Sequence, residues 1–276
     1  MHESCKIVLD SSADLTAMEG IPFAFAPLKV ITKETQYIDD ENLDVEAMAE
    51  ALYNYRGTST TSCPNVEDWL KAFGDAEEIL CITITGGLSG SYNSACAAKR
   101  HYEEAHPGRR VEVIDSLSAG PEIAMMAEKA RELLLAGKTL DEAVEGLKAY
   151  KTELFFMLES LQNFANNGRV SRLAAKTAGV LGIRALGRAS DQGTLELLEK
   201  VRGEERSLLA LARLIKARGY KGGKLRIAHC GNPSVAEALS MLMREQFPSA
   251  SVTVTTLRGL CSYYAERGGM LVGCEV

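Results

Sequence analysis

The chain has 276 residues, of which 46% are hydrophobic and 25% charged, and its formal net charge is −6 at pH 7. This length accommodates one large domain or two modest ones, each with its own core. The acidic balance argues against a nucleic-acid partner and against a surface rich in anionic lipid. No run of about 18 apolar residues occurs, so we expect no stable membrane insertion.

The seven cysteines and four histidines form neither a disulfide pattern nor a metal-binding pattern. The number of cysteines is odd, and none stands in a C-x-x-C pair. Most lie inside apolar runs, where cysteine acts as a small hydrophobe. The histidines lack metal-ligand spacing. The first residues also lack a basic segment followed by an apolar one, so we expect a reduced, cytoplasmic protein with no metal site.

The first half of the chain alternates predicted strands with predicted helices. In chain order we expect strands at 6–10 and 23–31, helices at 44–55 and 66–75, a strand at 78–84, a helix at 91–104, a strand at 110–116, and helices at 121–138 and 139–150. Pro121 suits a first helical turn, and Thr139 with Glu142 forms a capping-box pattern. Such alternation predicts right-handed crossovers and a mostly parallel sheet covered on both faces.

The second half changes character. Its expected elements are a strand at 153–160, a loop and helix within 163–179, two strands within 182–202 joined by a turn at 191–193, a helix at 204–217, and a strand–helix–strand unit across 224–257. A hairpin mixed with helices indicates an antiparallel sheet. We therefore predict an α/β protein: a three-layer N-terminal α/β domain with a parallel sheet (residues 1–150), followed by a C-terminal α+β domain with a mostly antiparallel sheet (residues 151–276).

A turn with the sequence Gly-Gly-Leu-Ser-Gly-Ser joins the strand at 78–84 to the next helix. The hydroxyls of Thr85, Ser89 and Ser91 lie there beside backbone N–H groups near a helix N-terminus, which carries a partial positive charge. This arrangement suits an anionic ligand, although a capped loop without a ligand has the same composition. The turn is neither a phosphate loop ending in G-K-[ST] nor a G-x-G-x-x-G dinucleotide motif.

A nucleophilic serine is the second interpretation of this turn. The nucleophile elbow of lipases requires G-x-S-x-G, and Ser91 stands where the second glycine belongs. His229 follows a predicted strand and is the only plausible base for Ser89, but no acidic residue is identified that would orient it. A serine hydrolase acting on acyl esters therefore remains the alternative function.

Three further polar segments suit an anionic ligand. Segment 57–65 holds five hydroxyl side chains, whereas a helix cap requires only one. Segment 166–172 contains Arg169, whose planar guanidinium suits a carboxylate or phosphate. Segment 8–15 places Asp10 and Ser11 after a strand, at the edge where open α/β sheets bind ligands. A solvated loop, a surface arginine and local polar turns explain the same residues without a ligand.

Taken together and in this order, these segments resemble the DegV family of bacterial proteins, over nearly the whole chain. The matching stretches are IVLDSSADL (7–15), APLKV (26–30), YIDDENL (37–43), TSCPN (61–65), ITGGLSGSYNSA (84–95), VIDS (113–116), NGRVS (167–171) and KVRG (200–203).

The resemblance implies a long-chain fatty acid held between two domains, with no other cofactor and no catalytic residue in this chain. It also implies a partner, the ATP-binding subunit of a fatty acid kinase, which phosphorylates the presented carboxylate; this chain has no recognisable ATP-binding motif of its own. Carried over by motif, the residues around the carboxylate are Thr61, Ser62, Ser89, Gly90 and Arg169. Weaker candidates are Ser11, Thr85, Ser91, His229 and Tyr264.

The C-terminal segment departs from the family pattern. The H-x-G-P-G element is replaced within 262–273, where Tyr264 or Ala265 stands at the histidine position and no proline follows. The family's I-K-P-I-L stretch appears as IRALG at 183–187. Because that histidine helps to order the carboxylate end in relatives, a lipid sensor or reservoir without a kinase partner is a third interpretation.

Overall fold

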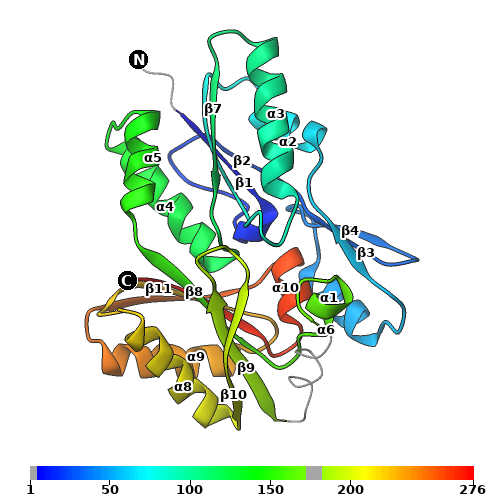
Figure 1. Cartoon of the computed structure of the whole chain (residues 1–276), viewed down its shortest axis with the longest axis vertical. Coiled ribbons are helices and arrows are strands. Elements are labelled where there is room, and N and C mark those ends of the chain that lie inside the picture. The colour runs from blue at the N-terminus through cyan, green and yellow to red at the C-terminus, as the bar shows by residue number, and fades with distance from the viewer. Residues whose placement is uncertain (1–4, 172–181) are drawn as a thin grey trace.

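The computed structural model describes residues 5–171 and 182–276, and its first main sheet has four parallel strands. They lie in the order β2 (Phe23–Ala26), β1 (Lys6–Asp10), β6 (Glu78–Thr83) and β7 (Arg110–Asp115). Helices α2 (Val66–Phe73) and α3 (Ser91–Ala105) cover one face, and α4 (Pro121–Leu135) and α5 (Leu140–Ala149) cover the other (Figure 1). Alternate residues of β1 separate accordingly: Val8 packs toward α2, whereas Ile7 and Leu9 pack toward α4. The predicted three-layer arrangement is confirmed.

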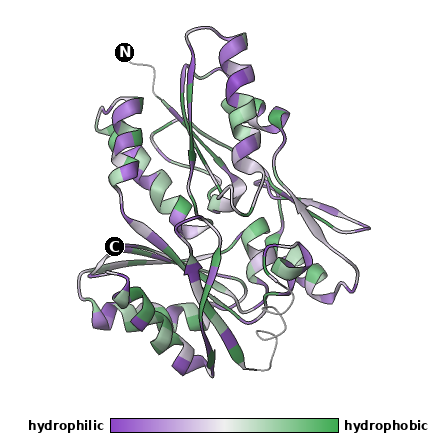
Figure 2. Cartoon of the chain, in the orientation of Figure 1, coloured by the Kyte–Doolittle hydropathy of each residue, from purple (hydrophilic) through white to green (hydrophobic). Residues whose placement is uncertain are grey.

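The second main sheet has six strands and is mostly antiparallel, as predicted. Its order is β10 (Leu195–Arg202), β9 (Ile183–Ala189), β8 (Thr152–Leu158), β13 (Met270–Glu275), β11 (Gly223–His229) and β12 (Ala250–Thr256). Only β11 and β12 pair in parallel. Helices α8 (Glu204–Ala217) and α9 (Pro233–Gln246) cover one face, and the short helices α6 (Gln162–Asn166) and α10 (Gly259–Ala265) lie on the other. Figure 2 shows hydrophobic residues concentrated along these strands and along α8.

A third, small antiparallel sheet was not predicted. It places β3 (Lys29–Ile31) between β4 (Gln36–Ile38) and β5 (Thr60–Ser62). The single strand expected over 23–31 is therefore wrong: β2 and β3 belong to different sheets, and Pro27, which lacks a backbone N–H, lies between them. Likewise, β5 lies inside the hydroxyl-rich segment 57–65, for which no strand was predicted.

Most helices lie where the periodicity predicted them, with ends that differ by a few residues. Helix α1 (Val45–Asn54) follows the Asp44 cap. The capping box of Thr139 and Glu142 begins α5. The helix expected over 121–138 ends at Leu135, because Gly137 takes a positive φ of 82°. Of the helix expected within 163–179, α6 is the described part, and residues 172–179 lie outside the described ranges.

Two helices, α4 and α10, connect the N-terminal and C-terminal parts of the chain. Helix α4 covers the parallel sheet and also contacts β8, β11 and β13 of the second sheet. In return, α10 contacts β3 and the short 3-10 helix η1 (Ser11–Ala13). Gly273 allows one close approach, since a Cβ there would lie 2.9 Å from the backbone N of Glu122. The main sheets are built from residues 6–115 and 152–275, and the predicted domain division at residue 150 stays a prediction.

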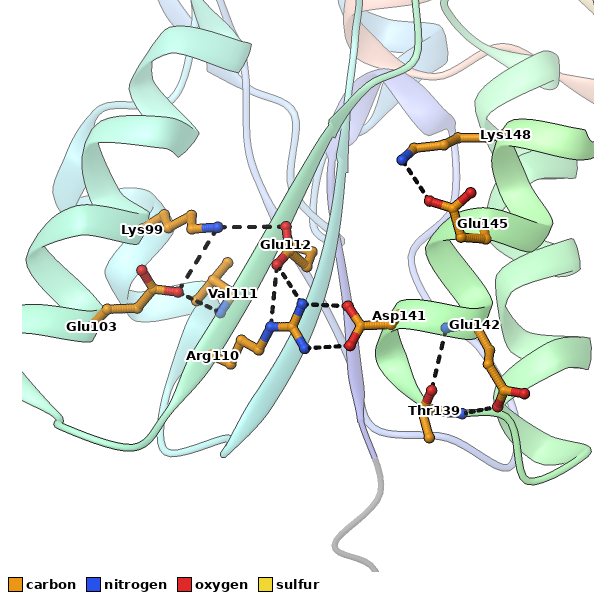
Figure 3. Close-up of polar contacts among 10 residues, drawn as sticks. All are labelled: Lys99, Glu103, Arg110, Val111, Glu112, Thr139, Asp141, Glu142, Glu145 and Lys148. Atoms are coloured by element: carbon orange, nitrogen blue, oxygen red, sulfur yellow. Dashed lines mark hydrogen bonds and ion pairs between the residues drawn. The ribbon is translucent and has the colours of Figure 1, made fainter.

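Ion pairs at the outer end of β7 connect it to helices on both faces (Figure 3). The Arg110 guanidinium donates to Glu112 at 2.9 Å and to Asp141 of α5 at 2.9 Å, and Lys99 of α3 lies 3.5 Å from Glu112. These groups are partly or fully exposed, and because water and salt screen such pairs, they contribute little to stability. The buried clusters on both faces of each sheet, rather than these pairs, therefore position the loops described below.

Candidate functional site

An apolar cavity lies between the loops of the parallel sheet and one face of the second sheet. Most of the residues that line it are apolar, as in other small-molecule sites. Leu154, Phe156 and Leu158 of β8 line it together, because residues two apart on a strand face the same side. Across from them, Ile84 and Leu117 line the cavity from loops of the parallel sheet. The space is therefore bounded by both main sheets.

Gly187 makes room for the ring at the base of this cavity. It pairs with Phe156 across β8 and β9, and a Cβ at 187 would lie 2.2 Å from Phe156 Cζ. Real Cβ atoms do not approach another atom so closely, so the Phe156 ring occupies space that only glycine leaves open.

A polar hollow adjoins the apolar cavity. Its lining residues come from the turn after β6, the start of α3, the segment after α6 and the β9–β10 hairpin. They are Gly86, Gly87, Leu88, Ser89, Gly90, Asn93, Asn167, Gly168, Arg169 and Thr194. Leu88 lines both spaces, so the change from apolar to polar surroundings occurs at this one side chain.

Asp10 fixes the turn that forms one wall of the hollow. Its buried carboxylate accepts hydrogen bonds from Ser91 Oγ at 2.6 Å and from the Ile84 backbone N–H at 2.9 Å. It also accepts from the hydroxyl and backbone N–H of Ser12. Burial raises the pKa of Asp10, and these hydrogen bonds act in the opposite direction. Ser91 is thus a structural donor rather than a residue of the hollow.

Gly90 brings the turn against the hydroxyl-rich segment. A Cβ at this position would lie 3.2 Å from Cys63 Sγ, so a larger residue would require Cys63 to move. The Gly90 N–H has no acceptor among the described residues, whereas the Ser89 N–H donates to the Thr85 carbonyl at 3.2 Å. Ser89 Oγ accepts from the Ser91 N–H at 3.3 Å. The hydroxyl proton of Ser89 and the N–H of Gly90 are therefore available to an anion.

Arg169 lies on the opposite wall of the hollow. Its Nε donates to the Leu88 carbonyl at 3.2 Å, and its Nη1 donates to the Asn167 carbonyl at 2.6 Å. These contacts hold the guanidinium over the turn that carries Ser89. The structure thus brings Arg169, Ser89 and Gly90 together around one space, although Arg169 lies 79 residues beyond Gly90 in the chain.

Thr61 and Tyr264 meet beside the apolar cavity. Their hydroxyl oxygens are 2.8 Å apart, and the Tyr264 ring stacks on Phe164 with 4.6 Å between ring centroids. Tyr264 itself lines the cavity. Burial raises the pKa of the Tyr264 phenol, which keeps it protonated and able to donate. Neighbouring Ser62 instead donates its hydroxyl to the Cys63 carbonyl at 3.2 Å.

The remaining candidates, Ser11, Thr85 and His229, do not line the polar hollow. Ser11 is buried and accepts from the Leu28 N–H at 3.0 Å. Thr85 lines the cavity, but its hydroxyl oxygen accepts from the Gly87 N–H at 3.0 Å. His229 lines neither space, and its Nδ1 accepts from the Asn232 N–H at 3.3 Å. No hydrogen bond in the described part of the chain joins His229 to Ser89, so the geometry gives the hydrolase interpretation no support.

Several residues of the site were missed from the sequence. Asp115, at the end of β7, accepts from the Gly86 N–H at 3.1 Å and from the Leu117 N–H at 3.0 Å, and so orders two loops. Asn167 Nδ2 donates to the Tyr263 hydroxyl at 2.9 Å. Both residues lie in motifs noted above, VIDS and NGRVS, but no local pattern indicated these roles. Thr194, which lines the hollow from the β9–β10 hairpin, lies in none of the motifs noted above.

Two further observations concern the described ranges 5–171 and 182–276. No group of three or more histidine, cysteine, aspartate or glutamate side chains is placed to hold a metal ion. No helix there combines the length and the apolar character needed to cross a bilayer.

The fold and the two adjoining spaces define an α/β protein with two main sheets and an apolar cavity that meets a polar hollow. The sequence profile described as "uncharacterised protein, DegV family" matches residues 4–273, and the chain belongs to the DegV family. A DegV domain-containing protein of Streptococcus pneumoniae is 42% identical over 278 residues, which cover 98% of this chain and 99% of the relative.

Solved structures share the fold closely. A DegV family protein from Eubacterium eligens, loaded with heptadecanoic acid, has a TM-score of 0.96 and 42% identity, and the match covers 99% of this chain and 100% of that one. The fatty acid kinase (Fak) B3 protein of Streptococcus pneumoniae, loaded with linoleic acid, has a TM-score of 0.96 and 40% identity, with 99% of each chain covered. These two relatives bind fatty acids.

The burial of His229 should make the protein less stable in acid. Burial lowers the pKa of His229 below its ordinary 6.5, so the unfolded chain takes up the proton first as the pH falls. We expect the urea-derived free energy of unfolding to fall between about pH 7 and pH 5 less steeply in His229→Gln than in the wild type. His101→Gln, on the exposed side of α3, is the control. Equal slopes for wild type and His229→Gln would contradict the prediction.

Proposed function

We propose that this protein binds a long-chain fatty acid between its two predicted domains, residues 1–150 and 151–276, and presents the carboxylate to a separate ATP-dependent kinase subunit. The observation that carries the proposal is an apolar cavity that meets a hollow lined by Arg169, Ser89 and Gly90. Fatty acids bound in relatives with TM-scores of 0.96 support it.

The two ends of a fatty acid require opposite surroundings. Burial of a saturated tail of about sixteen carbons is worth on the order of 10 kcal/mol before the cost of association, at ~0.8 kcal/mol per CH₂. The carboxylate cannot follow the tail unpaired, because an isolated buried ion costs several kcal/mol or more. The ligand therefore stops where donors begin, and in this chain that point is Leu88.

Six groups are proposed to surround the carboxylate. Arg169 supplies positive charge, and the Ser89 hydroxyl and the Gly90 N–H supply hydrogen bonds from the facing turn. Thr61 and Tyr264 lie at the edge of the apolar cavity, where the hydroxyl pair can turn a proton toward the ligand. Ser62 belongs to the same segment, but its hydroxyl already donates to a backbone carbonyl, so it contributes least.

In the proposed reaction, the carboxylate of the bound fatty acid receives a phosphoryl group from ATP that is held by a separate kinase subunit. The relative named fatty acid kinase (Fak) B3 supports a kinase partner, and cytoplasmic ATP would be the phosphoryl donor. In this role the chain is the substrate-presenting component and has no catalytic residue of its own. The altered segment 262–273 favours one alternative, a lipid sensor or reservoir without a kinase.

Lipid analysis of the purified protein tests the binding function. We expect native mass spectrometry and organic extraction to reveal a fatty acid of C14–C18 at about one per chain, because burial of the tail holds it through purification. Delipidated protein should take up added fatty acid of the same length. Protein that is repeatedly free of lipid and takes up none would overturn the proposal.

The affinity of the site should depend on the charge of the ligand's headgroup. Arg169→Ala and Ser89→Ala should each weaken binding of a fatty acid about tenfold or more, since a hydrogen bond to a charged group is worth ~1.5–3 kcal/mol. Binding of the corresponding methyl ester should change much less. Arg206→Ala, which removes an exposed arginine from α8, is the matched control. Equal losses for acid and ester would show that these residues do not bind the carboxylate.

Acyl phosphate formation distinguishes a kinase component from a reservoir. Lipid-loaded protein, ATP and the ATP-binding subunit of a fatty acid kinase should together yield acyl phosphate, whereas the loaded protein with ATP alone should yield none. If lipid remains bound and no kinase subunit produces acyl phosphate, the reservoir interpretation replaces the carrier.

A further inference from the structure

Helix α10 lines the apolar cavity, and one of its residues, Tyr264, lies close enough to Arg169 of the polar hollow for the guanidinium to act on the pKa of its phenol. Four of its seven residues line the apolar cavity: Leu260, Cys261, Tyr264 and Ala265. Tyr264 also reaches Thr61, whose hydroxyl lies 2.8 Å from its own. Where α10 sits therefore decides where the Tyr264 hydroxyl sits.

Two carboxylates from the first forty residues hold the start of this helix. Asp39 Oδ1 accepts from the Gly259 N–H at 3.1 Å, and its Oδ2 accepts from the Leu260 N–H at 2.9 Å. Asp14 Oδ1 accepts from the Arg258 N–H at 3.0 Å. The side chain of Arg258, the N-cap residue of α10, makes no capping hydrogen bond. The first N–H groups of α10, which every helix leaves unpaired, are thus satisfied by residues more than 200 positions away.

The fit between Asp39 and α10 requires glycine at position 259. A Cβ there would lie 2.3 Å from Asp39 Cγ and 2.5 Å from its Oδ1, so any other residue would force the two apart. Asp39 is itself held in place, because its N–H donates to the Leu28 carbonyl at 2.9 Å. Its side chain is only 1% exposed, and burial raises its pKa.

A displacement of the start of α10 would also move the residues further along this short helix. Leu260 and Tyr264 are four residues apart, on the same face and separated by about 6 Å of rise. Because α10 has only seven residues, a displacement of its first turn moves Tyr264 as well. The Tyr263 hydroxyl, 2.9 Å from Ser59 Oγ, adds a second contact at the far end.

We propose that Asp39 is a positioning residue for the ligand site: by binding the Gly259 and Leu260 N–H groups, it sets α10 so that the Tyr264 hydroxyl meets Thr61 at the carboxylate end of the cavity. The proposal rests on the proposed fatty-acid binding. It assigns to Asp39, which lines neither space, an effect on the preference for a free acid over a neutral ester.

The test is a double-mutant cycle on the ratio of affinities for a C16 fatty acid and its methyl ester. Asp39→Asn replaces one carboxylate oxygen by an NH₂ group that faces a backbone N–H, so we expect the ratio to fall about tenfold. Tyr264→Phe should lower the ratio too. In the Tyr264→Phe background, Asp39→Asn should cause no further fall, because the hydroxyl that it positions is gone. Asp40→Asn, the adjacent carboxylate, is the matched control and should leave the ratio unchanged.

Gly259→Ala gives an independent arm, because it displaces α10 while keeping the Asp39 carboxylate, and it should lower the ratio in the same way. Thermal unfolding of each variant shows whether the chain is folded when binding is measured. Equal losses for acid and ester, or effects of Asp39→Asn and Tyr264→Phe that add independently, would overturn the positioning role. A wild-type protein that binds no fatty acid would instead overturn the proposed function.

Discussion

The carboxylate of Asp10 has no contact with solvent and accepts four hydrogen bonds, which join the end of β1 to η1, to the residue after β6 and to the first turn of α3. A buried carboxylate is costly unless such donors surround it, so these segments cannot separate without leaving it unpaired. Ser89 and Gly90 directly precede Ser91, which donates to Asp10. The geometry of the polar hollow therefore depends on a side chain that does not line it.

The same principle operates between the two main sheets. Residues of the N-terminal segment bind backbone groups of the C-terminal one: Asp14 and Asp39 accept from the start of α10, and α4 packs against three strands of the second sheet. The apolar cavity is lined by Ile84 and Leu117 from the N-terminal segment and by β8 and α10 from the C-terminal one. A ligand tail in this cavity would contact both sheets, so its burial and the association of the sheets would stabilise each other.

Long periodic elements could be predicted from the sequence, and short or distant pairings could not. The crossover helices and the β9–β10 hairpin carry local patterns, as do the turns at Ser89 and Arg169. By contrast, β3, β4 and β5 have three residues each, too few for a periodicity. β13 was not predicted either, because Gly273 interrupts its apolar run, although the strand lies in the middle of its sheet. Asp39 contacts α10 across 220 residues, a pairing that no local pattern encodes.

With the carboxylate at the hollow, the two halves of the site would discriminate ligands by different physics. In the proposed site, Arg169 would act through its charge and Ser89 through a hydrogen bond, and an uncharged headgroup would lose the interaction with the charge. The β8 residues Leu154, Phe156 and Leu158 act through apolar contact, which changes by only ~0.8 kcal/mol per CH₂. The polar end would thus select the class of lipid sharply. Selection among tails would be gradual by comparison, and it would depend on the shape that Phe156 takes in the space left by Gly187.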